Sequence, residues 1–297
     1  SHCEIRHYGM GIGHPPPLTM RDPTAPLDLG GALAELAAAH VAPIHGWWWR
    51  MGPAWRMERR VLPNGLLYIP IDRTVVAEVG GERRSVPPGW LAVMPPGLVQ
   101  AARYRGRPPR RFDLLCLHLT VADRHGRDLL QRLPRFLRVP GWPGCLPRLR
   151  RLAEAIHGGG ADGQAYGAIG LRQLVADLIA AAGGLQPQPE PDPRIARCLA
   201  LIAADPGGRL AVGALARAAG VGPRRLRDLF RAATGLTPKQ HLIRVRIAEA
   251  TRLLADPRLR VREVAARLGF ASDHEFHACF RRVAGVTPSA WRRRGGM

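Results

Sequence analysis

The stretch that decides the fold occurs twice in the C-terminal part of the chain. The first copy consists of Leu215-Ala-Arg-Ala-Ala-Gly220, Leu226-x-x-x-Phe230-Arg231 and Gly235-Leu-Thr-Pro238. The second consists of Val264-Ala-Ala-Arg-Leu-Gly269, Phe276-x-x-x-Phe280-Arg281 and Gly285-Val-Thr-Pro288. The offset between the copies is 49 residues up to the glycine and 50 after it. The two copies are therefore one repeated unit, with one extra residue in the turn of the second.

Each copy is predicted to be a helix, a glycine-containing turn and a second helix, over about 210–231 and 259–282. A short helix with an apolar stripe ends at Gly220 or Gly269, where a left-handed residue is needed, and an arginine-bearing helix follows. This order is typical of helix-turn-helix units, whose second helix lies in the major groove of DNA. The segment 241–255 has apolar residues at helical spacing, which predicts a rigid connection between the units. Recognition helices about 34 Å apart would enter successive major grooves.

Composition limits the partners and the location of the protein. The 297 residues carry a net charge of +21, which favours a polyanion as partner, nucleic acid first and an acidic membrane surface second. No apolar run approaches the ~18–20 residues that span a bilayer. The start Ser1-His2-Cys3-Glu4 lacks the features of a secretory signal, so we expect a cytoplasmic, nucleoid-associated protein. The five cysteines form no Cys-x-x-Cys pair and are predicted to be free thiols.

The rest of the chain predicts an α+β protein of two domains. Residues 1–40 form a partly irregular arm, with one helix over 31–40. From His45 to about Thr120, short apolar runs separated by glycine and proline turns predict an antiparallel β-unit, either a small barrel or a sandwich. Helical periodicity follows over 123–133, 146–156 and 166–182, so the first domain is predicted to cover 41–184.

A proline-rich segment separates the two domains. Proline occupies every second position from Pro187 to Pro193, which is typical of an extended, semi-stiff linker over 185–193. The second, all-helical domain then covers 194–297. The helix over 166–182 has a wide apolar stripe, which we expect to pack on the β-unit and on a second copy of the chain in a homodimer.

The C-terminal part, from about Arg209 to Arg293, resembles the AraC/XylS family of bacterial transcription regulators. The resemblance rests on Phe-Arg followed by Gly-x-Thr-Pro in both copies, on Arg246-Ile-Ala-x-Ala-x-x-Leu-Leu254, and on Ala265-x-x-x-Gly-Phe270 with Pro288-x-x-x-Arg292. It implies a sequence-specific regulator with a tandem helix-turn-helix domain that binds adjacent major grooves of double-stranded DNA. It also implies RNA polymerase as a further partner.

The resemblance assigns DNA contacts to both recognition helices. Arginine pairs bidentately with guanine, so Arg224 and Arg227 suit base readout worth ~1–3 kcal/mol each. Asp273 and Glu275 repel phosphate, although either carboxylate can accept from cytosine N4 or orient a basic neighbour. The first unit is therefore expected to supply more of the base contacts. The implied DNA-binding residues are Arg224, Arg225, Arg227, Asp228 and Arg231 in the first unit and Asp273, His274, Glu275, His277 and Arg281 in the second.

The region from about Trp49 to Leu119 is similar to the cupin-like effector domains of many family members. The clearest match is Val86-Pro-Pro-Gly-Trp-Leu-Ala-Val-Met-Pro-Pro-Gly97, where two turns bracket a strand. The resemblance implies a cupin-like antiparallel β-barrel with packing helices that binds an effector and dimerises. Metal-dependent cupin enzymes need a His-x-His pair and a later histidine. This chain has no His-x-His, and Gln100 stands at the later position, so we expect no metal, no cofactor and no enzyme activity.

The candidate effector site is a metal-free pocket, since small-molecule pockets are mostly apolar with a few aimed polar groups. The candidate lining residues are Trp47, Trp49, Tyr68, Arg73 and Met94. We interpret the protein as a one-component regulator in which a small molecule changes how the tandem domain sits on DNA. Two alternatives remain: a constitutive DNA-binding protein whose β-domain only dimerises, and a metal-dependent cupin enzyme with an accessory DNA-binding domain.

Overall fold

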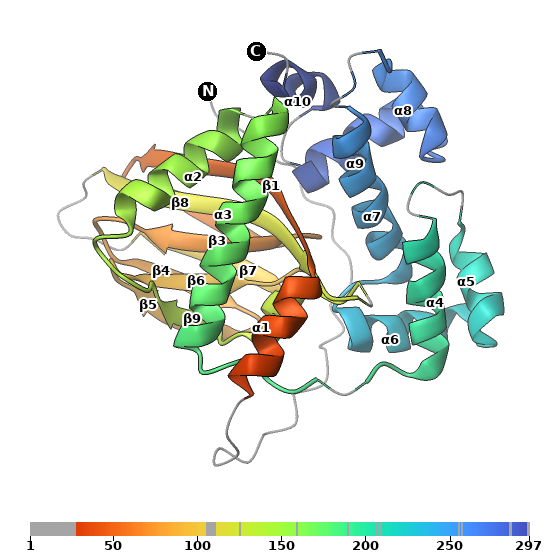
Figure 1. Ribbon diagram of the computed structural model, residues 1–297, viewed down its shortest axis with the longest axis horizontal. Helices are drawn as coiled ribbons and strands as arrows, with labels where there is room; N and C mark the ends of the chain where they lie inside the picture. Colours follow the sequence, from red (N-terminus) through yellow and green to blue (C-terminus); the bar gives the residue numbers. More distant parts are fainter. Residues whose placement is uncertain are drawn as a thin grey trace.

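A computed structural model of the chain has a β-rich N-terminal domain and an all-helical C-terminal domain (Figure 1). It describes residues 28–104, 111–124, 126–158, 160–188, 190–205, 207, 210–254, 256, 258–284 and 287–295. The predicted α+β, two-domain architecture is thus confirmed. Residues 1–27 of the predicted arm lie outside the described residues.

Two antiparallel sheets form the N-terminal domain. The first contains, in spatial order, β1 (His40–Met51), β8 (Phe112–Ala122), β3 (Gly65–Pro70), β6 (Trp90–Met94) and β9 (Phe136–Arg138). The second contains β2 (Arg56–Val61), β7 (Val99–Tyr104), β4 (Val75–Val79) and β5 (Glu82–Val86). Within the described strands, no hydrogen-bonded ladder joins the two sheets, so the domain is an open sandwich and the predicted barrel is not closed.

The five-stranded sheet is covered on both faces. Leu67, Leu115 and Leu117 pack under α1 (Leu29–Ala38), α2 (Leu146–Gly158) and α3 (Gly160–Ala181), which lie over one face (Figure 1). Their strand neighbours Tyr68 and Leu114 face the second sheet, because successive side chains of a strand point to opposite sides. This double burial explains why β3 is buried along its whole length.

The helix predicted over 123–133 is wrong. The segment instead makes a turn with Gly126 at φ +74°, followed by a short 3-10 helix, η1 (Leu129–Arg132). Asp123 accepts from the backbone N–H of Arg127 at 2.8 Å, and Asp128 accepts from the N–H of Leu130 at 3.0 Å. Short carboxylate side chains that bond nearby N–H groups offer the backbone an alternative to a helix. The other three helices predicted in this half are confirmed as α1, α2 and α3.

The C-terminal domain contains α4 (Pro193–Ala204), α5 (Val212–Ala219), α6 (Pro223–Thr234), α7 (Pro238–Leu253), α8 (Val261–Arg267), α9 (Asp273–Ala284) and α10 (Pro288–Gly295). Gly220 and Gly269 have φ values of 63° and 68°, as the predicted turns require. Helix α6 begins three residues after Gly220 and α9 four residues after Gly269, which confirms the extra residue in the second turn. Within the described ranges, no helix has the length and apolar character of a membrane span.

Each helix-turn-helix unit has its own core. Leu226 and Phe230 are fully buried with residues of α4 and α5 in the first unit. Phe276 and Phe280 are fully buried with residues of α7 and α8 in the second. Ile44 of β1 packs into this second core, so the N-terminal domain contributes a side chain to the second unit.

Candidate DNA-binding helices and ligand site

Helix α6 presents an arginine-rich face to solvent. Pro223 occupies its first turn, and Gly235 ends it in a left-handed conformation with φ 73°. Because Leu226 and Phe230 point into the core, the 3.6-residue period turns the intervening side chains outward. The exposed residues are Arg224, Arg225, Arg227 and Asp228, and Arg231 is half-buried.

Helix α9 carries the second set of predicted DNA contacts. Asp273, His274 and Arg281 are exposed, whereas Glu275 and His277 are half-buried. The Glu275 carboxylate accepts from the N–H of Ala271 at 3.0 Å, and the Ser272 hydroxyl accepts from the N–H of Glu275 at 3.1 Å. This side-chain pair caps the helix N-terminus. The Ser-x-x-Glu spacing was the available sequence signal for it. Ten residues of the two recognition helices, Glu275 among them, are expected from the sequence to contact DNA. Base contact by each of them stays a prediction.

The C-terminal ends of both recognition helices contact the N-terminal domain. The Gln131 side-chain amide donates to the Thr234 carbonyl, the last of α6, at 2.9 Å. The His45 Nδ1–H donates to the Ala284 carbonyl, the last of α9, at 2.9 Å. Thr234 and Ala284 are 50 residues apart and thus occupy the same position in the repeat. The N-terminal domain therefore binds both units at equivalent points.

A buried ion pair also joins the two domains. Arg244 of α7 lies 3.3 Å from Asp128, and their side chains are only 4% and 0% exposed. Arg244 also donates to the Gly126 carbonyl at 3.1 Å. Burial raises the pKa of Asp128 to about 6, although Arg244 acts in the opposite direction. Removal of one partner of such a pair typically costs about 3–5 kcal/mol because the other charge stays buried. Arg244 and Asp128 therefore depend on each other at the contact between the domains.

Four of the five candidate effector residues lie on the face of the first sheet that meets the second sheet. Tyr68 and Met94 are fully buried between the sheets. Trp47 and Trp49 stack at 4.7 Å on β1, the edge strand. Cys116 of β8 lies between Trp47 and Tyr68, which are its register partners on the neighbouring strands β1 and β3. Arg73 is exposed in the turn between β3 and β4, outside the strands that carry the other four.

Sequence reasoning missed Arg60 in this region, and it gave Gln100 no role beyond marking the position of an absent metal ligand. Strand β2 pairs Met57 with Ala102 and Arg60 with Gln100, so three steps on β2 match two on β7. This bulge turns Arg60 inward although Arg59 beside it faces outward. Gln100 is fully buried, and neither atom of its amide has a hydrogen-bond partner in the described structure. The sequence Arg-Met-Glu-Arg-Arg-Val has no alternation that reveals the bulge.

A buried histidine pair connects this region with the second unit. Asn64 donates to the Nδ1 of His118 at 3.0 Å, and the His118 ring stacks on His45 at 4.0 Å. Burial lowers the pKa of His118 well below its ordinary value, and the neighbouring His45 and Arg60 lower it further. His118 is therefore neutral, and the stack extends from the space between the sheets to the end of α9.

Comparison with known proteins identifies the helical domain. A helix-turn-helix domain family matches residues 215–294. The HTH-type transcriptional activator RhaR of Cronobacter sakazakii is 43% identical over 76 residues, which are 26% of this chain and 27% of RhaR. RhaR of Salmonella heidelberg is 45% identical over 69 residues, 23% of this chain and 24% of RhaR. Residues 215–294 form an AraC-type helix-turn-helix domain. The chain spans about a quarter of the length of these curated relatives.

The likeness in fold extends beyond the AraC-type domain. The crystal structure of ToxT from Vibrio cholerae O395 with a bound small molecule has a TM-score of 0.50 at 9% identity. The match covers 86% of this chain and 99% of ToxT. At this identity the comparison shows only a common fold, a β-rich domain followed by a helical domain.

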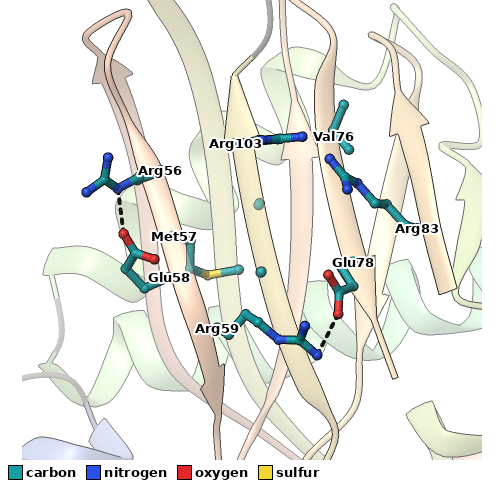
Figure 2. Close-up of a pocket in the computed structure, with 10 residues that line it drawn as sticks. Arg56, Met57, Glu58, Arg59, Val76, Glu78, Arg83 and Arg103 are labelled. Atoms are coloured by element: carbon teal, nitrogen blue, oxygen red, sulfur yellow. Dashed lines mark hydrogen bonds and ion pairs between the residues drawn. The ribbon is translucent and has the colours of Figure 1, made fainter. Parts of the chain in front are cut away.

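The outer face of the second sheet, which points away from the first sheet, has a shallow groove of about 450 Å³. Figure 2 shows two ion pairs in it, Arg56 with Glu58 at 2.5 Å and Arg59 with Glu78 at 2.9 Å. Three of these four side chains are largely exposed, with 72% of the Arg56 side chain accessible, whereas the Glu78 side chain is 21% exposed. Ion pairs in such a setting contribute little to stability. The groove is thus an open charged surface rather than an enclosed pocket.

Metal ligands and disulfides do not define the candidate site. In the described part of the chain, no group of three or more His, Cys, Asp and Glu side chains is arranged to hold a metal ion. The four described cysteines, Cys116, Cys145, Cys198 and Cys279, are free thiols, as predicted. Burial raises the pKa of the Cys116 thiol to about 12, so this group is protonated and unreactive at neutral pH.

Proposed function

We propose that this protein is a transcription regulator whose AraC-type domain reads DNA through α6 and α9. The carrying observation is the repeated helix-turn-helix unit, with exposed arginines on α6 and a single continuous helix, α7, between the units. The net charge of +21 supports a nucleic-acid partner. RNA polymerase is a further partner in this proposal, which places the protein with the nucleoid in the cytoplasm and assigns it no catalytic step.

The proposal divides the chain as the sequence predicts. Residues 1–40 form the arm, 41–184 the effector-binding and dimerisation domain, 185–193 the linker and 194–297 the DNA-binding domain. Most of the apolar stripe of α3 is buried against the sheet, but Tyr166 and Ile169 remain 49% and 73% exposed. We assign these two side chains to the homodimer contact. Residues 210–231 and 259–282 are the two DNA-binding units.

The proposed response to a small molecule depends on the contact between the domains. An effector shifts an equilibrium only if it binds one arrangement of the domains better than the other. Strand β1 carries Trp47 and Trp49 of the candidate ligand site together with His45, which donates to the last carbonyl of α9. A ligand that displaces β1 would therefore change the support of the second recognition helix.

The test is fluorescence anisotropy with DNA from upstream of the protein's own gene against scrambled DNA of equal length. We expect a preference of about a thousandfold that survives at ~150–200 mM salt, since non-specific binding weakens steeply with salt. Arg224→Ala and Arg227→Ala should each reduce this preference by about five- to 150-fold, the equivalent of one lost bidentate base contact. Arg59→Ala, on the outer face of the β-sandwich, is the charge-matched control.

Two outcomes would contradict the proposal or part of it. Equal loss of affinity for both DNAs in the arginine variants would identify phosphate contacts and remove the base-reading role. Equal, salt-sensitive binding of the wild-type protein to both DNAs, with and without a metabolite panel, would contradict sequence-specific regulation. If no metabolite changes the thermal stability, the constitutive DNA-binding alternative is favoured. Stoichiometric iron, manganese or zinc in the purified protein would favour the enzyme alternative.

A further inference from the structure

Three arginines cross the outer face of the second sheet from strand to strand. Arg56 of β2 is the register partner of Arg103 of β7, and Arg103 is in turn the partner of Val76 of β4. Arg83 of β5, on the other side of β4, lines the same groove. Figure 2 shows the Arg103 and Arg83 side chains extending toward Val76 from its two sides. We call Arg56, Arg83 and Arg103 the arginine row.

Two members of the arginine row lack an anionic partner. The ion pairs of the groove use Arg56 and Arg59. Arg83 is the register partner of Glu78, but the Glu78 carboxylate pairs with Arg59 instead. Among the described residues, neither Arg83 nor Arg103 forms an ion pair. The groove therefore contains two positive charges that no carboxylate of this chain offsets.

The arginine row is unfavourable for the protein on its own. Like charges directly opposite each other on neighbouring strands destabilise a sheet, and Arg56 and Arg103 are such a pair. Arg83 and Arg103 are exposed, so water and salt weaken the repulsion but supply no fixed counter-charge. An anionic group bound over the row would remove this repulsion.

The shape of the groove favours a segment of a protein over a small molecule. Small-molecule pockets enclose most of the ligand, whereas this groove is shallow, with Val76 and Ala101 as a small apolar floor. A protein segment that covers the floor would exclude water and strengthen its contacts with the arginines. Arg83 and Arg103 come from strands on either side of β4, with backbones about 10 Å apart. This separation suits two carboxylates, each bound by one guanidinium, rather than one compact anion.

The position of the arginine row argues against DNA as the occupant. Gly97, just before β7, meets the C-terminal end of α6, whereas Arg103 lies near the opposite end of β7. Figure 1 shows β4 and β5 on the side of the molecule away from the AraC-type domain. Helix α3 covers the other sheet, so its exposed residues lie on a different face. The groove is thus separate from the surfaces that the proposed function assigns to DNA and to the homodimer.

We propose that the outer face of the second sheet binds an acidic segment of a partner protein. Two carboxylates of that segment bind Arg83 and Arg103, and its backbone lies over Val76 and Ala101. This is a third interaction surface, and it stays accessible while α6 and α9 are on DNA.

The experiment measures peptide binding to the full chain in the presence of saturating duplex DNA, which occupies the recognition helices. The probe is a fluorescein-labelled peptide of two Asp-Thr-Glu-Thr repeats, and its neutral counterpart has two Asn-Thr-Gln-Thr repeats. By anisotropy at ~50 mM salt, we expect the neutral peptide to bind about tenfold or more weakly than the acidic one. Arg83→Gln combined with Arg103→Gln should weaken binding of the acidic peptide by about tenfold or more.

Arg84→Gln is the matched control on the same strand. Arg84 is exposed like its neighbour Arg83, but it pairs with Glu82, and its guanidinium lies over the Phe136 ring of the first sheet. Successive side chains of a strand point to opposite sides, so Arg84 does not line the groove. Arg84→Gln should therefore keep the wild-type affinity for the acidic peptide.

A second measurement tests the arginine row without any ligand. Because Arg103 is opposite Arg56, Arg103→Gln should raise the Tm of the free protein at ~20 mM salt, and the gain should shrink at ~500 mM salt. Arg84→Gln loses an ion pair and should not raise the Tm at either salt concentration. The same measurement shows whether the variants are folded.

Four results would overturn the inference. They are equal binding of the acidic and neutral peptides, unchanged binding of the acidic peptide by the double variant, a Tm of Arg103→Gln at or below that of wild type at low salt, and a loss of DNA affinity in the double variant. The last result would identify DNA as the occupant of the groove. Peptide binding that depends on Arg83 and Arg103 would support the inference even if the protein shows no preference for its upstream DNA, so the two proposals fail separately.

Discussion

At the scale of single residues, His241 is a buried, neutral histidine at the contact between the domains. Its ring packs edge-on against Phe230 at 5.3 Å, and its Nδ1 has no hydrogen-bond partner in the described structure. A Cβ at Gly126 of the N-terminal domain would lie 3.3 Å from its Nε2. Burial lowers the pKa of His241 to about 3, and the nearby Arg244 lowers it further.

This pKa predicts acid sensitivity. Above pH 6.5, His241 is neutral in both the folded and the unfolded chain. As the pH falls below 6.5, the unfolded chain gains a proton and the folded chain does not, so the free energy of unfolding decreases. From His241 alone we expect a loss of about 2 kcal/mol at pH 5 relative to pH 8. His241→Leu should remove this part of the pH dependence, as measured by urea unfolding between pH 8 and 5.

The exposed His274 provides the control for that measurement. His274→Leu makes the same side-chain change on an exposed helix face, away from the contact between the domains. The buried His118 contributes to wild type and both variants alike, so the difference between wild type and His241→Leu isolates His241. Identical pH profiles for wild type and His241→Leu would contradict the expected role of this side chain.

At the scale of elements, the sequence predicts the helices and turns whose conformation is determined by residues close together in the chain. Gly220 and Gly269 end their helices because the left-handed conformation suits glycine, so both helix-turn-helix units can be predicted. The sequences of β2 and β5, Arg-Met-Glu-Arg-Arg-Val and Glu-Arg-Arg-Ser-Val, show no apolar alternation. Pairing with β7 and β4 stabilises these strands, and such long-range pairing leaves no local pattern. For the same reason, the inward position of Arg60 could not be predicted.

The two recognition helices begin differently, and this predicts a stability effect in α9. Helix α6 begins after Gly222 with no side-chain cap, whereas α9 begins with the Ser272 and Glu275 capping pair. Glu275→Ala should lower the free energy of unfolding by about 1 kcal/mol, and Glu275→Gln by less than half of that, because an amide oxygen still accepts from the N–H of Ala271. Urea unfolding at pH 7.5 measures both. Equal losses in the two variants would show that charge, and not capping, is the role of Glu275.

At the scale of the whole molecule, the N-terminal domain holds the AraC-type domain through contacts from separate strands and loops. His45 and Ile44 of β1 contact the second unit, and Gln131 of η1 contacts the first. Because the contacted carbonyls are equivalent in the repeat, the N-terminal domain fixes the position of one unit relative to the other. DNA binding requires a particular spacing of two recognition helices, so these contacts are where a ligand can act on DNA affinity.

The close contact of Gly97 with Gly235 gives the sharpest test of this arrangement. Gly97 has φ +81°, and a Cβ there would overlap the carbonyl oxygen of Gly235 at the end of α6. Gly81 has a similar φ of +93° but open space around it. Alanine at either position carries a backbone strain of about 1–2 kcal/mol, but only Gly97→Ala also forces the two domains apart. We therefore expect Gly97→Ala to increase the radius of gyration in small-angle scattering and to split thermal unfolding into two transitions. Gly81→Ala should lower the Tm but keep the wild-type radius of gyration and a single unfolding transition. If Gly97→Ala also keeps the wild-type radius and a single transition, the domains are not held together at this contact.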